Sequence, residues 1–240
     1  TNEINFYYYK NVELTADSRT LTYDGYEHGV SGYGCSVEGL TFEGITVEAM
    51  GKDAGEYPAA FERNETKPGY PLNKVDTTEK YNGNFSNVEF VVEDGILTIS
   101  KRSVKLTSEG GSKVYDGAPL TKPEVQIEGS FVDGEVLGIV AQGTVTDVSE
   151  GEVTNTIFFN RSPDFKDSNY NIVQNEGKLW ITPRQVTLTS ETASKPYDGT
   201  ALTNGDTPVK EEFGTEDAFP KNEGLKYTFT GSQTDAGSSK

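Results

Sequence analysis

The sequence predicts an all-β protein, built as a tandem array of small modules of the Ig-like β-sandwich type. Composition is the first observation behind this: 240 residues include 13 Tyr, 12 Phe and 26 Gly, with one Trp and one Met. Aromatic and β-branched residues favour strands, and glycine favours the tight turns that join them. The second observation is a Tyr-Asp-Gly motif that occurs three times, at Tyr23, Tyr115 and Tyr197.

The three motifs stand in a common register. Residues 95–108 align without a gap with residues 177–190, and the step from Tyr115 to Tyr197 is the same 82 residues. An upstream copy begins at Val12 and reaches its motif after the same interval, 92 residues before the second copy. Self-similarity at a fixed spacing is the mark of a repeat architecture.

Apolar residues alternate with polar ones in the repeated segments. The alternation is seen at Leu97 and Ile99, Val104 and Leu106, Leu179 and Ile181, and Val186 and Leu188. A period of two is typical of strands with one buried face. These segments are therefore expected to be half-buried strands.

The register divides the chain into three modules. Residues 1–100 form a divergent first module with a leading strand at 1–11, residues 101–182 a second module, and residues 183–240 an incomplete third. A second marker accompanies each motif, beginning at Lys52, Thr146 and Thr234. Each closing strand runs almost directly into the next opening strand, which predicts a stiff array.

A β-grasp-like module is the alternative fold. It requires a helix across its sheet, and the available segment is 120–140. This segment contains Gly129, Gly134 and Gly138 among β-branched residues, which disfavours a helix. The sandwich is therefore favoured.

Charge and composition exclude several classes of function. A formal charge of −17 would repel nucleic acid, and no apolar stretch is long enough to cross a bilayer. Cys35 and His28 are single in the chain, which excludes an internal disulfide and a Cys/His zinc set. No cofactor, metal or catalytic residue is predicted.

The Asp-Gly pair of the motif predicts a tight turn, because glycine takes positive φ freely and aspartate tolerates it. The tyrosine before it can fill the core and form a hydrogen bond through its hydroxyl. Asp24, Asp116 and Asp198 each supply one carboxylate to a module, far short of the roughly six to eight oxygens that calcium takes. Neighbouring acids such as Glu93 and Asp94 are interpreted as solvated surface rather than a glycosidase pair.

The chain resembles the Tyr-Asp-Gly (YDG) and MBG-type repeat modules of large bacterial cell-surface, adhesin-like proteins. The resemblance is carried by the Lys-x-Tyr-Asp-Gly-x-x-Leu-Thr segments at 113–121 and 195–203, by 231–240, and by the run Asn169 to Ile172. It implies a secreted or wall-attached protein on the outside of a bacterium, made of many such modules, with no enzymatic activity. The expected function is that of a stalk or adhesion spacer whose partners are its neighbouring modules.

The first module departs most from the pattern and is the expected place for a ligand site. Nine of the 13 tyrosines lie in the first 81 residues, and we single out Tyr26, Tyr33 and Tyr70 as candidate ligand-binding residues. Tyrosines of this kind can stack on sugars or contact proteins. The alternative function is therefore binding of a host glycan or surface protein by this module.

The third module stops short of the full repeat. Either the natural chain continues, or another chain completes the module in a head-to-tail filament. Continuation is the favoured expectation, and a filament subunit is the second alternative function.

Overall fold

A computed structural model describes residues 10–38, 45–61, 63–64, 67–71, 88–188, 192–203, 210–213, 220, 223–227 and 231–238. In this part of the chain nearly all regular structure is β-strand, and helix is limited to two short 3-10 turns, η1 (Val148–Glu150) and η2 (Asp167–Asn169). The predicted all-β class is confirmed. The segment considered for a β-grasp helix instead contains strands β13 (Leu120–Thr121), β14 (Val125–Gly129) and most of β15 (Val136–Ala141).

Two compact units are distinguished by their internal contacts. The first comprises residues 1–106, 127–138 and 159–174, and the second comprises residues 107–126, 139–158 and 175–240. The module boundaries near residues 100 and 182 stay a prediction.

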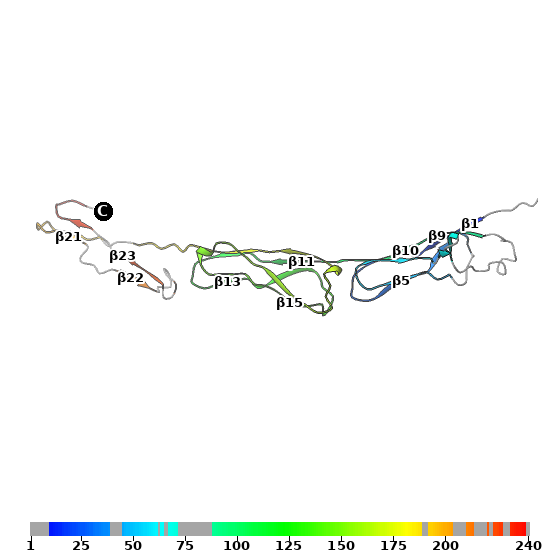
Figure 1. The fold of residues 1–240 in the computed structure, drawn as a ribbon. Coiled ribbons are helices and arrows are strands. Elements are labelled where there is room, and N and C mark those ends of the chain that lie inside the picture. Colours follow the sequence, from blue (N-terminus) through cyan, green and yellow to red (C-terminus); the bar gives the residue numbers. More distant parts are fainter. Residues whose placement is uncertain are drawn as a thin grey trace, which may run out of the picture. The chain divides into compact units, whose positions relative to one another are not determined.

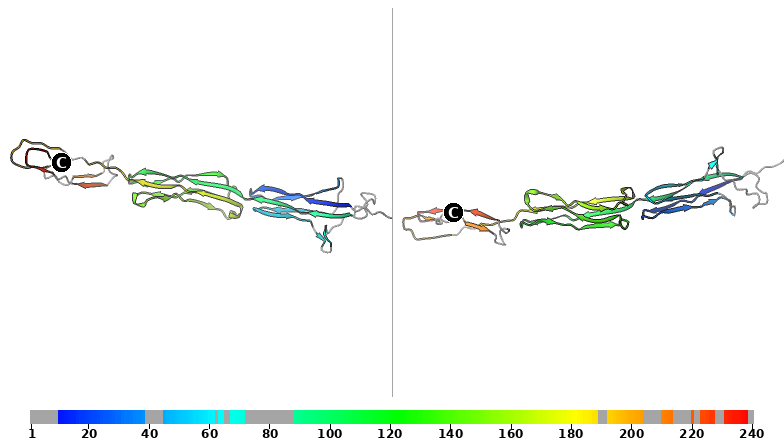
Figure 2. Two further views of the ribbon diagram at one scale, coloured as in Figure 1. Left: turned by 90° about the horizontal axis from the view of Figure 1, so that it is seen from above. Right: turned by 60° about the horizontal axis from the view of Figure 1, so that its bottom comes forward.

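The first unit holds two three-stranded sheets with similar pairing. In one, β1 (Lys10–Ala16) is antiparallel to β4 (Tyr33–Cys35) and parallel to β9 (Val88–Glu93). In the other, β10 (Gly95–Ser100) is parallel to β2 (Arg19–Thr22) and antiparallel to β6 (Gly55–Ala59). Figures 1 and 2 show the strands of this part of the chain, in blue and cyan, side by side. Two further antiparallel pairs are β3 (His28–Ser31) with β5 (Glu48–Gly51), and β7 (Arg63–Asn64) with β8 (Lys67–Pro71).

Alternation along these strands fills the core as the sequence predicts. Leu97 and Ile99 of β10 are buried, and so are Val104 and Leu106 of β11 (Arg102–Ser108). Gly95, at the start of β10, has a packing role: a Cβ there would lie 2.2 Å from the carbonyl oxygen of Asp17. A side chain at this position would push two backbone segments apart.

The second unit repeats this pairing. Strand β20 (Lys178–Thr182) is parallel to β12 (Gly111–Val114) and antiparallel to β17 (Val153–Thr154). Its core is formed by Leu179 and Ile181 of β20 with Val145 of β16 (Thr144–Val145), which pairs with β13. Gly177 matches Gly95, since a Cβ on it would lie 2.3 Å from the backbone nitrogen of Gly110.

The remaining strands extend this β structure. One sheet has the order β14-β11-β19, and β15 pairs with β18. In the C-terminal part, β21 pairs with β24 and β22 with β23. The bounds are β18 (Ile157–Arg161), β19 (Tyr170–Asn175), β21 (Leu202–Thr203), β22 (Lys210–Phe213), β23 (Gly224–Tyr227) and β24 (Ser232–Gln233).

One predicted strand is absent. Val186 and Leu188 lie outside any strand, and each is 38% exposed. The corresponding β11 is flanked by β14 and β19, whereas no strand of the described chain pairs with residues 183–188. An alternating pattern forms a strand only where a neighbour satisfies its backbone groups.

Candidate functional site

The Tyr-Asp-Gly motif forms the predicted tight turn at all three positions. The aspartate side chain accepts a hydrogen bond from the backbone N–H two residues later: Tyr26 to Asp24 at 3.0 Å, Ala118 to Asp116 at 3.0 Å and Thr200 to Asp198 at 2.9 Å. The glycine has a positive φ of 85°, 74° and 75° in the three copies. This turn fixes the direction in which each motif tyrosine points.

The end of a long strand anchors each of the first two motifs. The backbone N–H of Tyr23 donates to the Ser100 oxygen at 2.9 Å, and Arg102 donates to the Tyr23 oxygen at 3.1 Å. The same positions recur in the second copy, where Tyr115 donates to the oxygen of Thr182 and receives a hydrogen bond from Arg184. The motif tyrosine is thereby held beside the connection between two consecutive strands.

The side chain of Tyr23 joins a buried tyrosine–glutamate cluster. Its hydroxyl donates to one carboxylate oxygen of Glu135 at 2.5 Å, and the Tyr170 hydroxyl donates to the other at 2.7 Å. The two rings meet edge to face with centroids 5.6 Å apart. Tyr23 is 1% exposed and Glu135 is 6% exposed, so these charge-assisted hydrogen bonds are shielded from water. We call Tyr23, Glu135 and Tyr170 the Tyr23 cluster.

A second set of contacts lies at the second marker of the first copy. The Asp53 carboxylate pairs with Lys166 at 2.6 Å and accepts a hydrogen bond from the Asn169 amide at 2.9 Å. The Asn169 side-chain oxygen in turn accepts the Ala54 N–H at 2.8 Å. Asn169 is fully buried, so these bonds satisfy an amide that would otherwise be costly to bury. The pKa of Asp53 is lowered, mainly by its hydrogen bond with Lys166.

The second motif makes the corresponding tyrosine–glutamate contact within the second unit. The Tyr115 hydroxyl donates to Glu223 at 2.5 Å. This contact raises the pKa of Tyr115 to about 12, with burial as the next cause. The glycines of the first two motifs lie beside equivalent residues, Val132 after Phe131 and Pro220 after Phe219. A Cβ on Gly25 would lie 2.7 Å from Val132, and one on Gly117 would lie 3.1 Å from Pro220.

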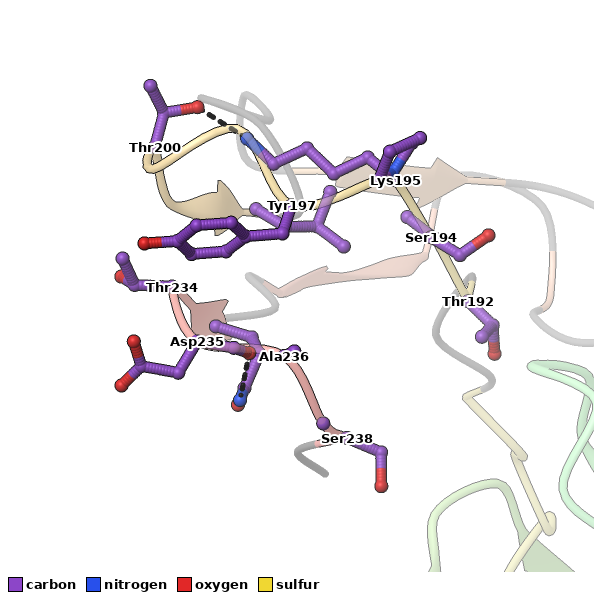
Figure 3. Close-up of a pocket in the computed structure, with 14 residues that line it drawn as sticks. Thr192, Ser194, Lys195, Tyr197, Thr200, Thr234, Asp235, Ala236 and Ser238 are labelled. Atoms are coloured by element: carbon purple, nitrogen blue, oxygen red, sulfur yellow. Dashed lines mark hydrogen bonds between the residues drawn. The ribbon is translucent and has the colours of Figure 1, made fainter.

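The third motif borders a pocket. The pocket has a volume of about 450 Å³ and is lined by residues 192–197, Thr200, Leu202 and residues 233–238. Figure 3 shows the Tyr197 ring over the segment that carries Thr234 and Asp235. Tyr197 is 69% exposed, and no atom of the described residues lies within 4 Å of a Cβ built on Gly199. We call this the Tyr197 pocket.

Burial in the Tyr23 cluster predicts a loss of stability at alkaline pH. Burial, and next the hydrogen bond to Glu135, raises the pKa of Tyr23 from 10.0 to about 12. The folded state therefore keeps this proton after the unfolded state has released it, and stability present below pH 10 is lost as pH rises toward 12. The expected slope from Tyr23 is about 1.4 kcal/mol per pH unit in that window. Urea denaturation of the first unit between pH 8 and 12 measures it.

Two tyrosine variants identify the source of that slope. Tyr23→Phe is expected to remove the Tyr23 part of the slope and to leave the part from Tyr170, whose pKa burial also raises, whereas Tyr26→Phe, which changes a ring that is 73% exposed, is expected to leave the slope unchanged. Equal slopes in wild type and Tyr23→Phe would contradict the assignment.

The sequence-predicted ligand tyrosines lie in different settings. Tyr26 is in the turn of the first motif and is exposed, whereas the Tyr33 ring in β4 packs against Phe61 with centroids 5.8 Å apart. Tyr70 belongs to β8, and its side chain lies outside the described residues. Of the two described side chains, Tyr26 is the more exposed, and Tyr33 is half-buried.

Sequence reasoning missed the residues that the motif tyrosines contact. Glu135 and Glu223 were not singled out, although both occur in the pattern Phe-x-x-x-Glu-x-Leu, at 131–137 and 219–225. A comparison of residues downstream of each motif reveals this pattern. Its role is invisible without the fold, because Tyr23 and Glu135 are 112 residues apart.

The described residues contain no group of three or more His, Cys, Asp or Glu side chains arranged to hold a metal ion. Within the same part of the chain, no helix is long and apolar enough to cross a membrane. Comparison of the chain with protein-family models, with curated proteins and with solved structures found no match.

Proposed function

We propose that the chain is a non-enzymatic structural part of a bacterial cell-surface protein, in which small Ig-like β-sandwich modules form a stiff spacer that displays a binding region. One observation carries the proposal: two successive Tyr-Asp-Gly tyrosines each donate a hydrogen bond to a glutamate far along the chain, Tyr23 to Glu135 and Tyr115 to Glu223. In the predicted module scheme each glutamate belongs to the next module. The motif is then a joint between modules rather than a ligand site.

The contacts of the first joint favour stiffness. Two sets of contacts connect the first module to the predicted second module. One is the Tyr23 cluster, through Glu135 and Tyr170, and the other is the pairing of Asp53 with Lys166 and Asn169. Two points of attachment oppose bending more than the short covalent connection alone would. A spacer needs this property, since a flexible chain would let the displayed region fall back toward the surface.

Spin labels across the first joint test the proposal. Cysteines replace the exposed Thr20 and Gln174 in a Cys35→Ser background, and each carries a nitroxide spin label. Double electron–electron resonance then gives the distribution of distances between the two labels. We expect a narrow distribution for the wild-type joint, broadened about twofold when Tyr23→Phe and Asp53→Ala remove the hydrogen bond and the ion pair.

Asp133→Asn is the matched control, because it removes an exposed carboxylate two residues from Glu135. Its distribution is expected to equal that of the wild type. A wild-type distribution as broad as that of the joint variant would overturn the spacer function.

A further inference from the structure

The first copy of the repeat begins and ends with strands that run side by side in the same direction. Strand β1 is parallel to β9 over six register pairs, the first of which places Lys10 opposite Val88. The same two chain segments then pair again, because β2 is parallel to β10 over four register pairs, the last of which places Thr22 opposite Ser100. The opening and closing segments of this copy are therefore joined along both pairs of strands.

Tension along the chain would load these parallel pairs in shear. It would pull Lys10 back past the start of β1 and Ser100 onward past the end of β10, so the two segments would be drawn in opposite directions along their own axes. Hydrogen bonds between parallel strands are evenly spaced, so they share such a load and must break together. If the first and last strands were antiparallel, the two pulled ends would be neighbours and the bonds would break one after another.

Buried side chains cover the hydrogen bonds that this tension would load. Val12 and Leu14 of β1, and Leu97 and Ile99 of β10, are each 2% exposed or less. A hydrogen bond beneath such a core is stronger than one in water, and solvent cannot replace it when it is stretched. The parallel pairs are therefore protected along the faces that these residues occupy.

The first Tyr-Asp-Gly motif closes the parallel pairs at the end where the chain leaves this copy. The Tyr23 N–H donates to the Ser100 oxygen at 2.9 Å, one step beyond the last register pair of β2 and β10. Arg102, in the strand that follows, donates to the Tyr23 oxygen at 3.1 Å. The chain is thus tied to the same tyrosine on both sides of its exit.

The second copy has the same arrangement. Strand β12 is parallel to β20 over four register pairs, the last of which places Val114 opposite Thr182. The Tyr115 N–H then donates to the Thr182 oxygen at 2.9 Å, as Tyr23 does to Ser100. The parallel pair and the motif tyrosine at its end therefore occur together twice in the chain.

We propose that the pairs β1–β9 and β2–β10, closed by Tyr23, form a shear clamp that lets the first copy carry tension along the chain without opening. This function goes beyond the proposed spacer, whose stiff joint opposes bending rather than pulling, and it rests on the proposed function only for the source of the tension. Forced opening is governed by the rate of unfolding rather than by equilibrium stability. The shear clamp slows that rate for a load applied along the chain.

Pulling one folded copy in two directions tests the proposal. Cysteines at exposed positions of the full 240-residue chain, in a Cys35→Ser background, carry DNA handles for magnetic tweezers. Glu13→Cys with Lys101→Cys pulls along the shear clamp, whereas Glu56→Cys with Lys101→Cys peels β6 from β10, its antiparallel neighbour. The released length, about 3.3–3.6 Å per residue between the handles, identifies the segment that opens.

The two directions are expected to give different opening forces. The force along the shear clamp should be about twofold higher or more, because bonds loaded in shear break together. Equal hydrogen exchange in β1 and β10 of the two cysteine pairs shows that both are folded alike. Equal opening forces, or a lower force along the shear clamp, would overturn the proposal.

Asp24→Ala tests the part assigned to the motif, because it removes the side-chain hydrogen bond of the turn that holds Tyr23. At a fixed force along the shear clamp, it should raise the opening rate by about tenfold, the effect of losing one hydrogen bond to a carboxylate. The rate of peeling β6 should stay the same. Glu27→Ala, at an exposed acid beside the same turn, is the matched control and should change neither rate. Equal rises in both directions would overturn the role of the motif in the shear clamp.

The outcome is separable from the spacer function. A narrow spin-label distribution at the first joint with equal forces in the two directions rejects the shear clamp alone. A broad distribution with unequal forces rejects the spacer and keeps the shear clamp, because both forces are measured within one copy.

Discussion

Asn155→Ala is expected to lower the free energy of unfolding of the second unit by about 3–5 kcal/mol. The Asn155 side chain is fully buried and joins three backbone segments. Its amide donates to the oxygens of Glu109 at 3.0 Å and Lys122 at 2.8 Å, and its oxygen accepts the Gly143 N–H at 2.8 Å. Alanine would leave those three backbone groups without this partner, together with a cavity.

The backbone of Asn155 is also fully hydrogen-bonded and closely packed. Its N–H donates to Gly177 at 2.8 Å, its oxygen accepts the Ser108 hydroxyl at 2.6 Å, and Ser108 in turn accepts the Gly177 N–H. A Cβ on Gly143 would lie 2.6 Å from the Asn155 Cα, so the site has little room to rearrange around a shorter side chain. The cost of the substitution is therefore expected near the upper end for one buried polar residue.

Trp180 makes the measurement direct, because it is the single tryptophan and lies in β20 of the second unit. Urea denaturation followed by its emission should show the loss. Hydrogen exchange in β1 and β10 of the first unit should stay close to that of the wild type. Asn175→Ala, at an exposed position of the second unit, is the control and should cost less than about 0.5 kcal/mol. A loss as small as that of Asn175→Ala would show that water replaces the Asn155 side chain.

Local pattern predicted the strands well where each had partners. The alternation at Leu97, Ile99, Leu179 and Ile181 identified buried faces. The repeated glycines, at the start of β10 and just before β20, correspond to close backbone contacts. The same alternation failed at Val186, where no described strand lies alongside. Periodicity reports which face would be buried, but the partner strand comes from elsewhere in the chain.

The contacts of the motif tyrosines could not be predicted in the same way. Tyr-Asp-Gly was correctly interpreted as a turn, because the turn depends on three adjacent residues. The Glu135 partner depends instead on a loop 112 residues away, and Asn155 reads in the sequence as an ordinary polar residue between strands. Long-range polar pairs of this kind leave no local periodicity. The repeated Phe-x-x-x-Glu-x-Leu pattern is a signal for Glu135 and Glu223 alone, and Asn155 has no such signal.

Glu135→Ala is expected to destabilise the first unit by about 2–4 kcal/mol. Glutamate accepts from both Tyr23 and Tyr170, and each charge-assisted hydrogen bond contributes about 1.5–3 kcal/mol. Removing a buried carboxylate also relieves its desolvation cost, which offsets part of the loss. The tyrosine hydroxyls do not gain from that relief, since both remain buried without their acceptor.

Hydrogen exchange of the first unit measures the effect, with Asp133→Ala as an exposed control in the same loop. A double-mutant cycle with Tyr23→Phe then isolates the pair: we expect a coupling of about 1–2 kcal/mol, because either change alone already breaks the same hydrogen bond. Additive losses would mean that Glu135 acts only through Tyr170. In that case the first motif would keep its turn but lose its role as a joint, since the Asp53 contacts alone would connect it to its neighbour.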